Sequence, residues 1–110
     1  MNSIEKFKIR TELNENRWIV HVSGVLDLSM SNEMRTVIEP LTELTKQALL
    51  LDLKDLTYID STGIGIILAI IKRRAASQAE FGIQNIPSNI QRLFDMTGIS
   101  KFIPSDGQTA

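Results

Sequence analysis

The stretch that decides the fold runs from Leu49 to Arg74 and reads LLLDLKDLTYIDSTGIGIILAIIKRR. It begins with a nearly continuous apolar run from Leu49 to Leu53, which is typical of a strand buried on both faces. It ends with apolar residues too dense for a single amphipathic stripe, which predicts a helix buried around most of its circumference. Strand, short loop and helix form half of a βαβ unit, in which ligands and modifications gather at the loop.

The size and composition of the chain predict one small globular domain over residues 1–110, since 43% of the side chains are hydrophobic and 23% are charged. The formal net charge of −1 gives no global basic field for nucleic acid or anionic lipid. Cysteine is absent, which excludes a disulfide scaffold, a thiol nucleophile and a thiolate metal site. No segment resembles a signal peptide or is long enough to span a bilayer, so we expect a cytoplasmic protein without nucleic-acid or membrane partners.

The N-terminal part of the chain predicts a β-hairpin followed by a helix. Alternating apolar and polar residues indicate an edge strand at Phe7–Leu13 and a second strand at Trp18–Ser23, and we expect Gly24 to end the pair. Apolar residues at helical spacing follow from Met30 to Leu44. Pro40 lacks a backbone donor and is expected to kink this helix.

The C-terminal part predicts one more strand and one more helix. The buried central helix is expected to end in the basic run Lys72–Arg74, where the helix dipole favours cations. A short strand is predicted at Phe81–Ile86, and Ser88 is the predicted N-cap of a helix that reaches Thr97. The last residues, about 105–110, are expected to fray. The apolar residues of the tail are expected to dock on the domain: Ile99, Phe102 and Ile103.

The resulting order β, β, α, β, α, β, α predicts an α/β fold. Its sheet is expected to be mixed, because the N-terminal hairpin is antiparallel and the later strands are joined by right-handed crossovers through helices. The helices are therefore expected to flank the sheet.

The sequence offers no catalytic residues, cofactor site or metal site. His21 is the only histidine and lies within a strand, and the residues around Ser61 do not form a Gly-x-Ser-x-Gly elbow. Asp52, Asp55 and Asp60 are spread along strand and loop without a convergent arrangement for a metal ion. Capping and solvation explain these carboxylates better, and we expect the chain not to be an enzyme.

The turn before the buried helix is where we expect the chemistry of this chain. Gly63 and Gly65 lack the further residues of a P-loop or a dinucleotide fingerprint, so they most simply let the helix approach the sheet. Ser61 and Thr62 leave two interpretations open. Either residue could simply cap the helix, or one could be a phosphoacceptor whose phosphate meets unpaired amides and a favourable helix dipole. The new charge beside Asp60 would then act on a binding partner.

Two blocks of this sequence resemble the bacterial anti-sigma factor antagonists, which are single STAS domains. The first block is DSTGIG at 60–65, preceded by LKDLTYI, and the second is RLFDMTGI at 92–99. The resemblance covers essentially the whole chain. It implies a partner-switching protein that binds a serine protein kinase anti-sigma factor and so frees a sigma factor, as in stress-response or sporulation control. Phosphorylation of Ser61 would release the chain from the kinase, and a serine phosphatase would reset the switch.

The resemblance also implies a switch loop that faces the partner. Asp27 matches an aspartate whose neighbourhood helps to form the kinase-facing surface, although Val25 replaces the usual acid and removes one charge. The implied switch loop comprises Asp27, Asp60, Ser61, Thr62, Gly63 and Gly65. Two other classes stay open, namely a non-switching STAS scaffold or adaptor and a small-ligand-binding STAS module.

Overall fold

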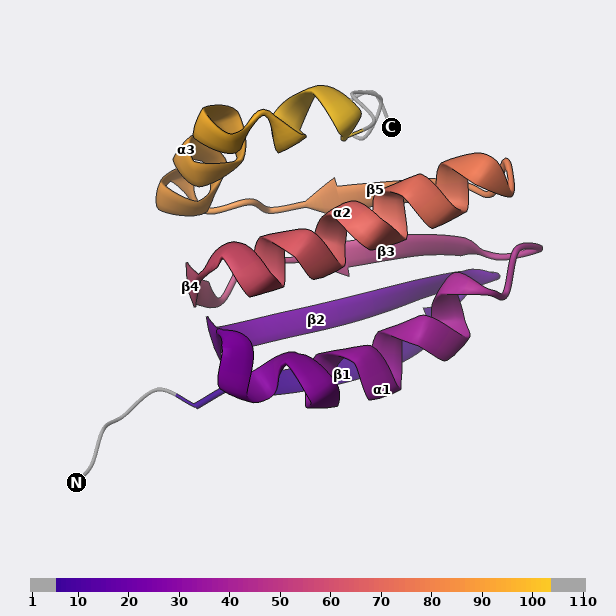
Figure 1. The fold of residues 1–110 in the computed structure, drawn as a ribbon. Helices are drawn as coiled ribbons and strands as arrows, with labels where there is room; N and C mark the ends of the chain where they lie inside the picture. Colours follow the sequence, from indigo (N-terminus) through magenta and orange to yellow (C-terminus); the bar gives the residue numbers. More distant parts are fainter. Residues whose placement is uncertain (1–5, 104–110) are drawn as a thin grey trace.

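The computed structural model describes residues 6–103 and shows a mixed five-stranded sheet flanked by helices (Figure 1). In chain order the elements are β1 (Lys8–Asn14), β2 (Arg17–Leu26), η1 (Leu28–Met30), α1 (Ser31–Thr42), β3 (Ala48–Asp52), β4 (Leu56–Ile59), α2 (Ser61–Ala76), β5 (Phe81–Gln84), α3 (Ser88–Thr97) and η2 (Ile99–Phe102). β1 pairs antiparallel with β2, and the remaining pairs, β2 with β3, β2 with β4 and β3 with β5, are parallel. The predicted α/β fold with an N-terminal hairpin is therefore confirmed.

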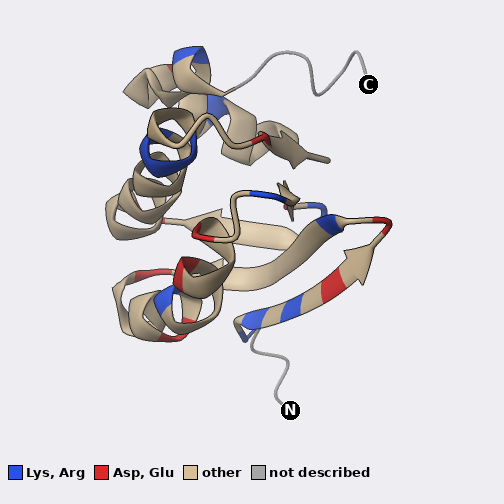
Figure 2. Cartoon of the chain, turned by 90° about the vertical axis from the view of Figure 1, so that its right-hand side faces the viewer, with Lys and Arg blue, Asp and Glu red and all other residues tan. Residues whose placement is uncertain are grey.

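The helices lie on one side of the sheet, as Figure 2 shows, and the described part of the chain places no helix against the other side. Val20 and Leu51 are fully buried on the helix-facing side, in one cluster with Ile38 of α1 and Ile67 of α2. Leu50, which points to the uncovered side, is only partly buried. The expectation of a central strand buried on both faces is thus wrong for β3.

β2 is longer than predicted, because Gly24 does not end it. The backbone of Gly24 has a φ of +84°, and an ideal Cβ there would lie 1.9 Å from the carbonyl oxygen of Lys6. The pairing register shifts between Gly24 and Val25, and β2 then continues to Leu26. Glycine therefore bends this strand, so that its last residues can pair with a different neighbour.

That neighbour is β4, a strand that the sequence did not predict. Leu56 and Ile59 are buried, whereas Thr57 and Tyr58 between them are exposed, so the four residues show no regular alternation. This segment falls within the loop expected between the apolar run and the buried helix. The later strand is correspondingly the fifth of the sheet, and it ends at Gln84 rather than at Ile86.

The helices differ from the prediction mainly at their ends. α1 is shorter than expected, since residues 28–30 form a separate 3-10 turn, and it continues through Pro40 to Thr42. α2 buries or half-buries its apolar residues from Ile64 to Ile71, as predicted, Ala69 excepted.

The C-terminal predictions were correct only in part. Ser88 was predicted as the N-cap of α3, but it is the first helical residue, and Pro87 occupies the cap position without a side-chain hydrogen bond. Ile99 and Ile103 dock on the core as expected, whereas Phe102 is 51% exposed. The expected fraying of about 105–110 lies outside the described residues.

Arg74 forms a buried connection that the sequence did not reveal. Its guanidinium is completely buried in the last turn of α2 and donates to four backbone carbonyls. The acceptors are the carbonyl oxygens of Thr42 (3.1 Å), Leu44 (3.3 Å), Gln47 (2.6 Å) and Glu80 (2.6 Å). One side chain therefore holds together the end of α1, the connection into β3 and the connection into β5. Neighbouring Arg73 is exposed and pairs with Glu43 at 2.9 Å.

Replacing Arg74 with methionine tests this connection. We expect Arg74→Met to lower the free energy of unfolding by about 3 kcal/mol or more, because buried carbonyls lose a charged donor. The matched control is Arg73→Met, which removes an exposed ion pair and should cost less than about 1 kcal/mol. Urea denaturation of both variants measures the difference. Equal effects would contradict the structural role of Arg74.

Asp52 is a second buried polar group and lies on the uncovered face of the sheet. It accepts hydrogen bonds from Lys54 N (3.0 Å), Asn85 Nδ2 (3.2 Å) and Gln84 Nε2 (3.4 Å). His21 lies between two carboxylates, with Nδ1 3.4 Å from Asp52 and Nε2 2.8 Å from Glu12. Burial raises the pKa of Asp52, but the hydrogen-bond donors and the charge of His21 outweigh burial and hold this pKa below its usual range.

The lowered pKa makes Asp52 a source of pH-dependent stability. Its contribution should be complete above the unfolded-state pKa of about 4 and disappear as the pH falls through the lower folded-state value. We expect Asp52→Ala to reduce the free energy of unfolding by about 1–3 kcal/mol at neutral pH, with the gap to wild type closing in acid. Urea denaturation at several pH values measures this gap. A gap independent of pH, or an equal one in the exposed-site control Asp55→Ala, would contradict the assignment.

Candidate functional site

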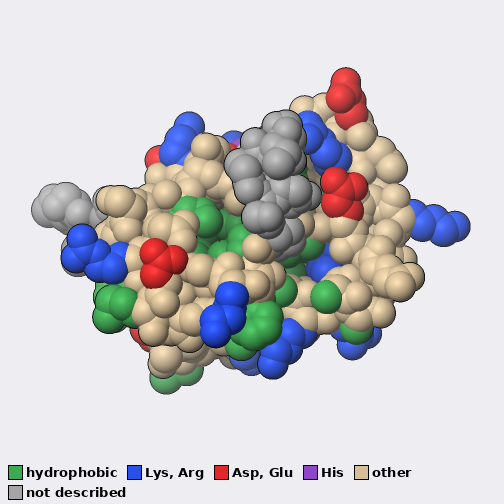
Figure 3. All heavy atoms as spheres, turned by 90° about the horizontal axis from the view of Figure 1, so that it is seen from above, with side chains coloured by type: hydrophobic (Ala, Val, Ile, Leu, Met, Phe, Trp, Pro, Cys, Tyr) green, Lys and Arg blue, Asp and Glu red, His purple; other side chains and the backbone are tan. Residues whose placement is uncertain are grey.

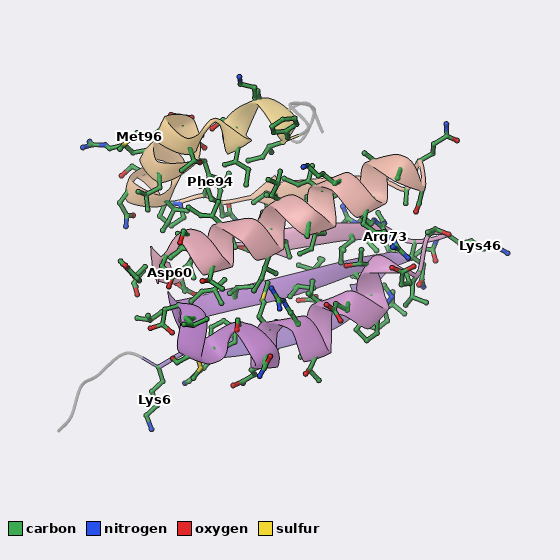
Figure 4. All side chains as sticks on the ribbon, in the orientation of Figure 1. Lys6, Lys46, Asp60, Arg73, Phe94 and Met96 are labelled. Atoms are coloured by element: carbon green, nitrogen blue, oxygen red, sulfur yellow. The ribbon has the colours of Figure 1, made fainter. Side chains whose placement is uncertain are left out.

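The candidate site lies where two loops meet at the carboxyl ends of the parallel strands. One loop follows β2 and carries Asp27, and the other leads from β4 into α2 and carries Asp60. The backbone N–H of Asp60 donates to the carbonyl oxygen of Leu26 at 3.2 Å, which joins the two loops at their bases. Figure 4 shows Asp60 at the start of α2, at one end of the molecule.

The carboxylate of Asp60 connects the two loops a second time. Its Oδ1 accepts from the N–H of Gly63 at 3.0 Å, which makes Asp60 the N-cap of α2. Its Oδ2 accepts from the N–H of Leu28 at 3.1 Å, in the turn that follows β2. The interpretation that Ser61 or Thr62 caps the helix is therefore wrong, because Asp60 already fills this role.

Ser61 therefore has no capping role, and no other structural role for its side chain is found among the described residues. It is the first residue of α2 and is exposed, and its hydroxyl makes no hydrogen bond within residues 6–103. Thr62 follows it and is partly buried. The hydroxyl of Ser61 is therefore exposed at the N-terminus of α2 and unpaired within the described residues.

Asp27 shapes the neighbouring loop. Its Oδ1 accepts from both the backbone N–H (3.0 Å) and the hydroxyl (2.6 Å) of Ser29, so it caps the 3-10 turn η1. Both Asp27 and Asp60 are partly exposed. The structure thus brings the two predicted acids to the same end of the sheet as Ser61.

The two glycines of the predicted switch loop have different roles. An ideal Cβ on Gly63 would lie 2.7 Å from Ile59 Cγ1 and 3.0 Å from Leu26 Cγ, both buried under the first turn of α2. A Cβ on Gly65 would meet nothing within 4 Å. The predicted close approach of helix and sheet therefore holds for Gly63 and is wrong for Gly65.

This difference gives a matched pair of substitutions. Gly63→Ala should lower the free energy of unfolding by about 1–3 kcal/mol, because the new methyl group collides with the core. Gly65→Ala should raise it by up to about 1 kcal/mol, because alanine is favoured at an exposed helical position. Thermal or urea unfolding separates the two, and a destabilising Gly65→Ala would contradict the assignment.

Two exposed apolar side chains beside the site were not singled out from the sequence. Leu28, whose N–H binds Asp60, is 68% exposed, and Tyr58 on β4 is 51% exposed. Val25 lies opposite Tyr58 in the strand pairing and is partly buried. Exposed apolar residues around a polar centre are typical of protein-binding surfaces. No local sequence signal distinguishes them, because the exposure of Tyr58 depends on how β4 pairs with β2 and that of Leu28 on the turn that Asp60 holds.

The described residues also bear on metals and membranes. Within residues 6–103, no group of three or more His, Cys, Asp or Glu side chains could hold a metal ion. None of the helices in this range is long and apolar enough to cross a membrane.

Comparison with known proteins agrees with this architecture. The model of the STAS domain family matches residues 8–109. The anti-sigma-B factor antagonist of Bacillus subtilis (strain 168) is 32% identical over 90 residues, which cover 82% of each chain. The protein of the same name from Staphylococcus aureus (strain NCTC 8325 / PS 47) is 29% identical over 91 residues, 83% of this chain and 84% of that one. The chain therefore belongs to the STAS domain family, and within it to the anti-sigma factor antagonists.

Solved structures share the fold. An anti-sigma factor antagonist from Mycobacterium paratuberculosis superposes with a TM-score of 0.84 at 21% identity, covering 94% of this chain and 88% of that chain. The phosphorylated form of the Bacillus cell fate determinant SpoIIAA superposes with a TM-score of 0.68 at 16% identity, covering 90% and 89%.

Proposed function

We propose that this chain is a phosphorylation-controlled antagonist of a serine protein kinase anti-sigma factor, with Ser61 as the phosphoacceptor. The observation that carries the proposal is that the helix cap and the exposed hydroxyl at the start of α2 belong to different residues. Asp60 caps the helix, so the exposed hydroxyl of Ser61 is left without a structural partner among the described residues. Unphosphorylated, the chain binds the kinase and frees a sigma factor.

A phosphate at Ser61 is compatible with the fold. It would add about −1.5 to −2 charges at the N-terminus of a sixteen-residue helix, where the helix dipole favours an anion. The domain should therefore stay folded when phosphorylated. In this proposal a serine phosphatase removes the phosphate, and the chain itself acts as substrate and ligand in the cytoplasm rather than as an enzyme.

In this proposal the phosphate weakens the binding of the partner rather than the stability of the fold. Asp27 and Asp60 are partly exposed beside Ser61, and the exposed side chain of Leu28 offers an apolar contact next to them. A partner that packs closely on this surface would have to desolvate the phosphate or bring its own acidic groups near it. Either costs binding free energy, so phosphorylation releases the partner. The remaining loop residues, Thr62, Gly63 and Gly65, would position Ser61 or line the contact.

Substitution of Ser61 tests the switch. We expect Ser61→Ala to stay folded, to accept no phosphate and to bind the kinase constitutively. Ser61→Asp should bind at least about 10-fold more weakly, because one carboxylate reproduces part of the phosphate charge. Intact-protein mass spectrometry with ATP and the serine kinase anti-sigma factors of the same genome identifies the kinase, and titration calorimetry measures binding.

Thr62→Ala is the matched control for the phosphoacceptor. It removes the adjacent hydroxyl and should still accept one phosphate, because the phosphoacceptor Ser61 remains. A phosphate that persists in Ser61→Ala, or Ser61→Asp binding as tightly as wild type, would contradict the proposal.

One observation favours the scaffold alternative. Figure 3 shows hydrophobic side chains gathered on the face that α3 and η2 form, where Met96 is 73% and Phe102 is 51% exposed. Exposed apolar side chains of this kind suit contact with another domain. Self-assembly of the chain at micromolar concentration, with no phosphate on Ser61 for any kinase, would favour the scaffold.

A further inference from the structure

Three lysines surround an open depression at the same end of the sheet as Ser61. Lys6 and Lys8 come from the start of β1, and Lys54 comes from the turn between β3 and β4. The same depression is lined by Gly24 and Asp55, so three lysines and one acidic residue border it. Figure 2 shows that Lys and Arg are concentrated along the first part of β1.

Within residues 6–103 these lysines have no ion-pair partner. All three are exposed, and the ion pairs found in this range involve other cations, such as Arg10 with Glu12 and Arg73 with Glu43. Lys54 binds Asp52 only through its backbone N–H. Like charges held together without partners repel one another, so the cluster does not serve the stability of the domain. It suits an external anion.

A short series of hydrogen bonds connects the depression with the candidate site. Gly24 accepts a hydrogen bond from the hydroxyl of Thr57 at 2.9 Å, and its own N–H donates to Asp55 O at 3.0 Å. Two residues further along β2, the carbonyl of Leu26 binds the N–H of Asp60. In Figure 4, Lys6 lies at the same end of the molecule as Asp60, and Lys46 lies at the opposite end.

We propose that Lys6, Lys8 and Lys54 form a docking surface for an acidic face of the kinase partner. This inference rests on the proposed function. It specifies in addition that the partner surface that contacts this end of the domain is negatively charged. An acidic partner face explains both halves of the switch, since the lysines attract it and a phosphate on Ser61 repels it.

The chemistry of the cluster favours a protein over other anions. Nucleic acid would require a wider basic field, whereas the chain carries a net charge of −1. A small phosphate is usually held by backbone amides and buried donors, whereas the three charged side chains here are exposed around an open depression. Exposed charges at the rim of an interface chiefly steer association.

Charge reversal tests the surface. We compare the double variant Lys8→Glu and Lys54→Glu with a matched control, Lys46→Glu and Lys72→Glu, which changes the net charge equally at exposed positions outside the depression. The probe is the serine kinase that phosphorylates wild-type Ser61, and stopped-flow fluorescence measures its association rate at low and high salt. Thermal unfolding checks that both variants are folded.

We expect the association rate of the Lys8/Lys54 variant to fall about 10-fold at low salt and the difference to shrink at high salt. The control should associate as wild type does. If both variants associate at the wild-type rate, or if both association rates fall equally, the docking proposal is contradicted while the proposed function stands. If no kinase binds or phosphorylates wild type, the proposed function fails first and the inference fails with it. If inorganic phosphate stabilises wild type but not the Lys8/Lys54 variant, and kinase association is unchanged, the cluster binds small anions instead.

Discussion

The carboxylate of Asp60 is the interaction on which the functional end of this domain depends. One oxygen caps α2 through Gly63, and the other holds the N–H of Leu28 in the turn after β2. Together with the backbone hydrogen bond from Asp60 to Leu26, this side chain fixes two loops that are far apart in the sequence to each other. Gly63 adds a steric condition, since a Cβ there would collide with Ile59 and lift the helix from the sheet. Ser61 is held between these two constraints.

The residue that stabilises the start of α2 is therefore not the proposed phosphoacceptor. Because Asp60 supplies the cap, the hydroxyl of Ser61 can change its charge without removing a hydrogen bond that the described fold uses. The helix dipole favours the added anion, so a phosphate would alter what the surface can bind rather than whether the domain folds. In the proposed switch, a phosphate on Ser61 would repel an acidic partner face, and the lysines of the neighbouring depression would attract it.

The two ends of the sheet are built differently. At the amino ends of β3 and β5, the buried guanidinium of Arg74 binds the carbonyls of Thr42, Leu44, Gln47 and Glu80 and so fixes the connections there. At the carboxyl ends, Asp52 gathers donors from Lys54, Gln84 and Asn85 on the uncovered face. Buried side-chain hydrogen bonds thus fix the connections at both ends, and the loops at the carboxyl ends also carry the exposed side chains of Leu28 and Ser61.

The sequence by itself determined the α/β class, the hairpin, the central strand and helix, and the turn that holds Asp60 and Ser61, because hydrophobic period and turn chemistry are local signals. It missed β4 and the bend at Gly24, since a four-residue strand is defined by its partner rather than by its own pattern. The sequence predicted only that Arg74 belongs to the basic end of a helix, because its acceptors lie up to 32 residues away in the chain. Only the tertiary structure decided that Asp60 rather than Ser61 caps α2 and that Gly63 rather than Gly65 touches the core, because both depend on atoms that folding brings together.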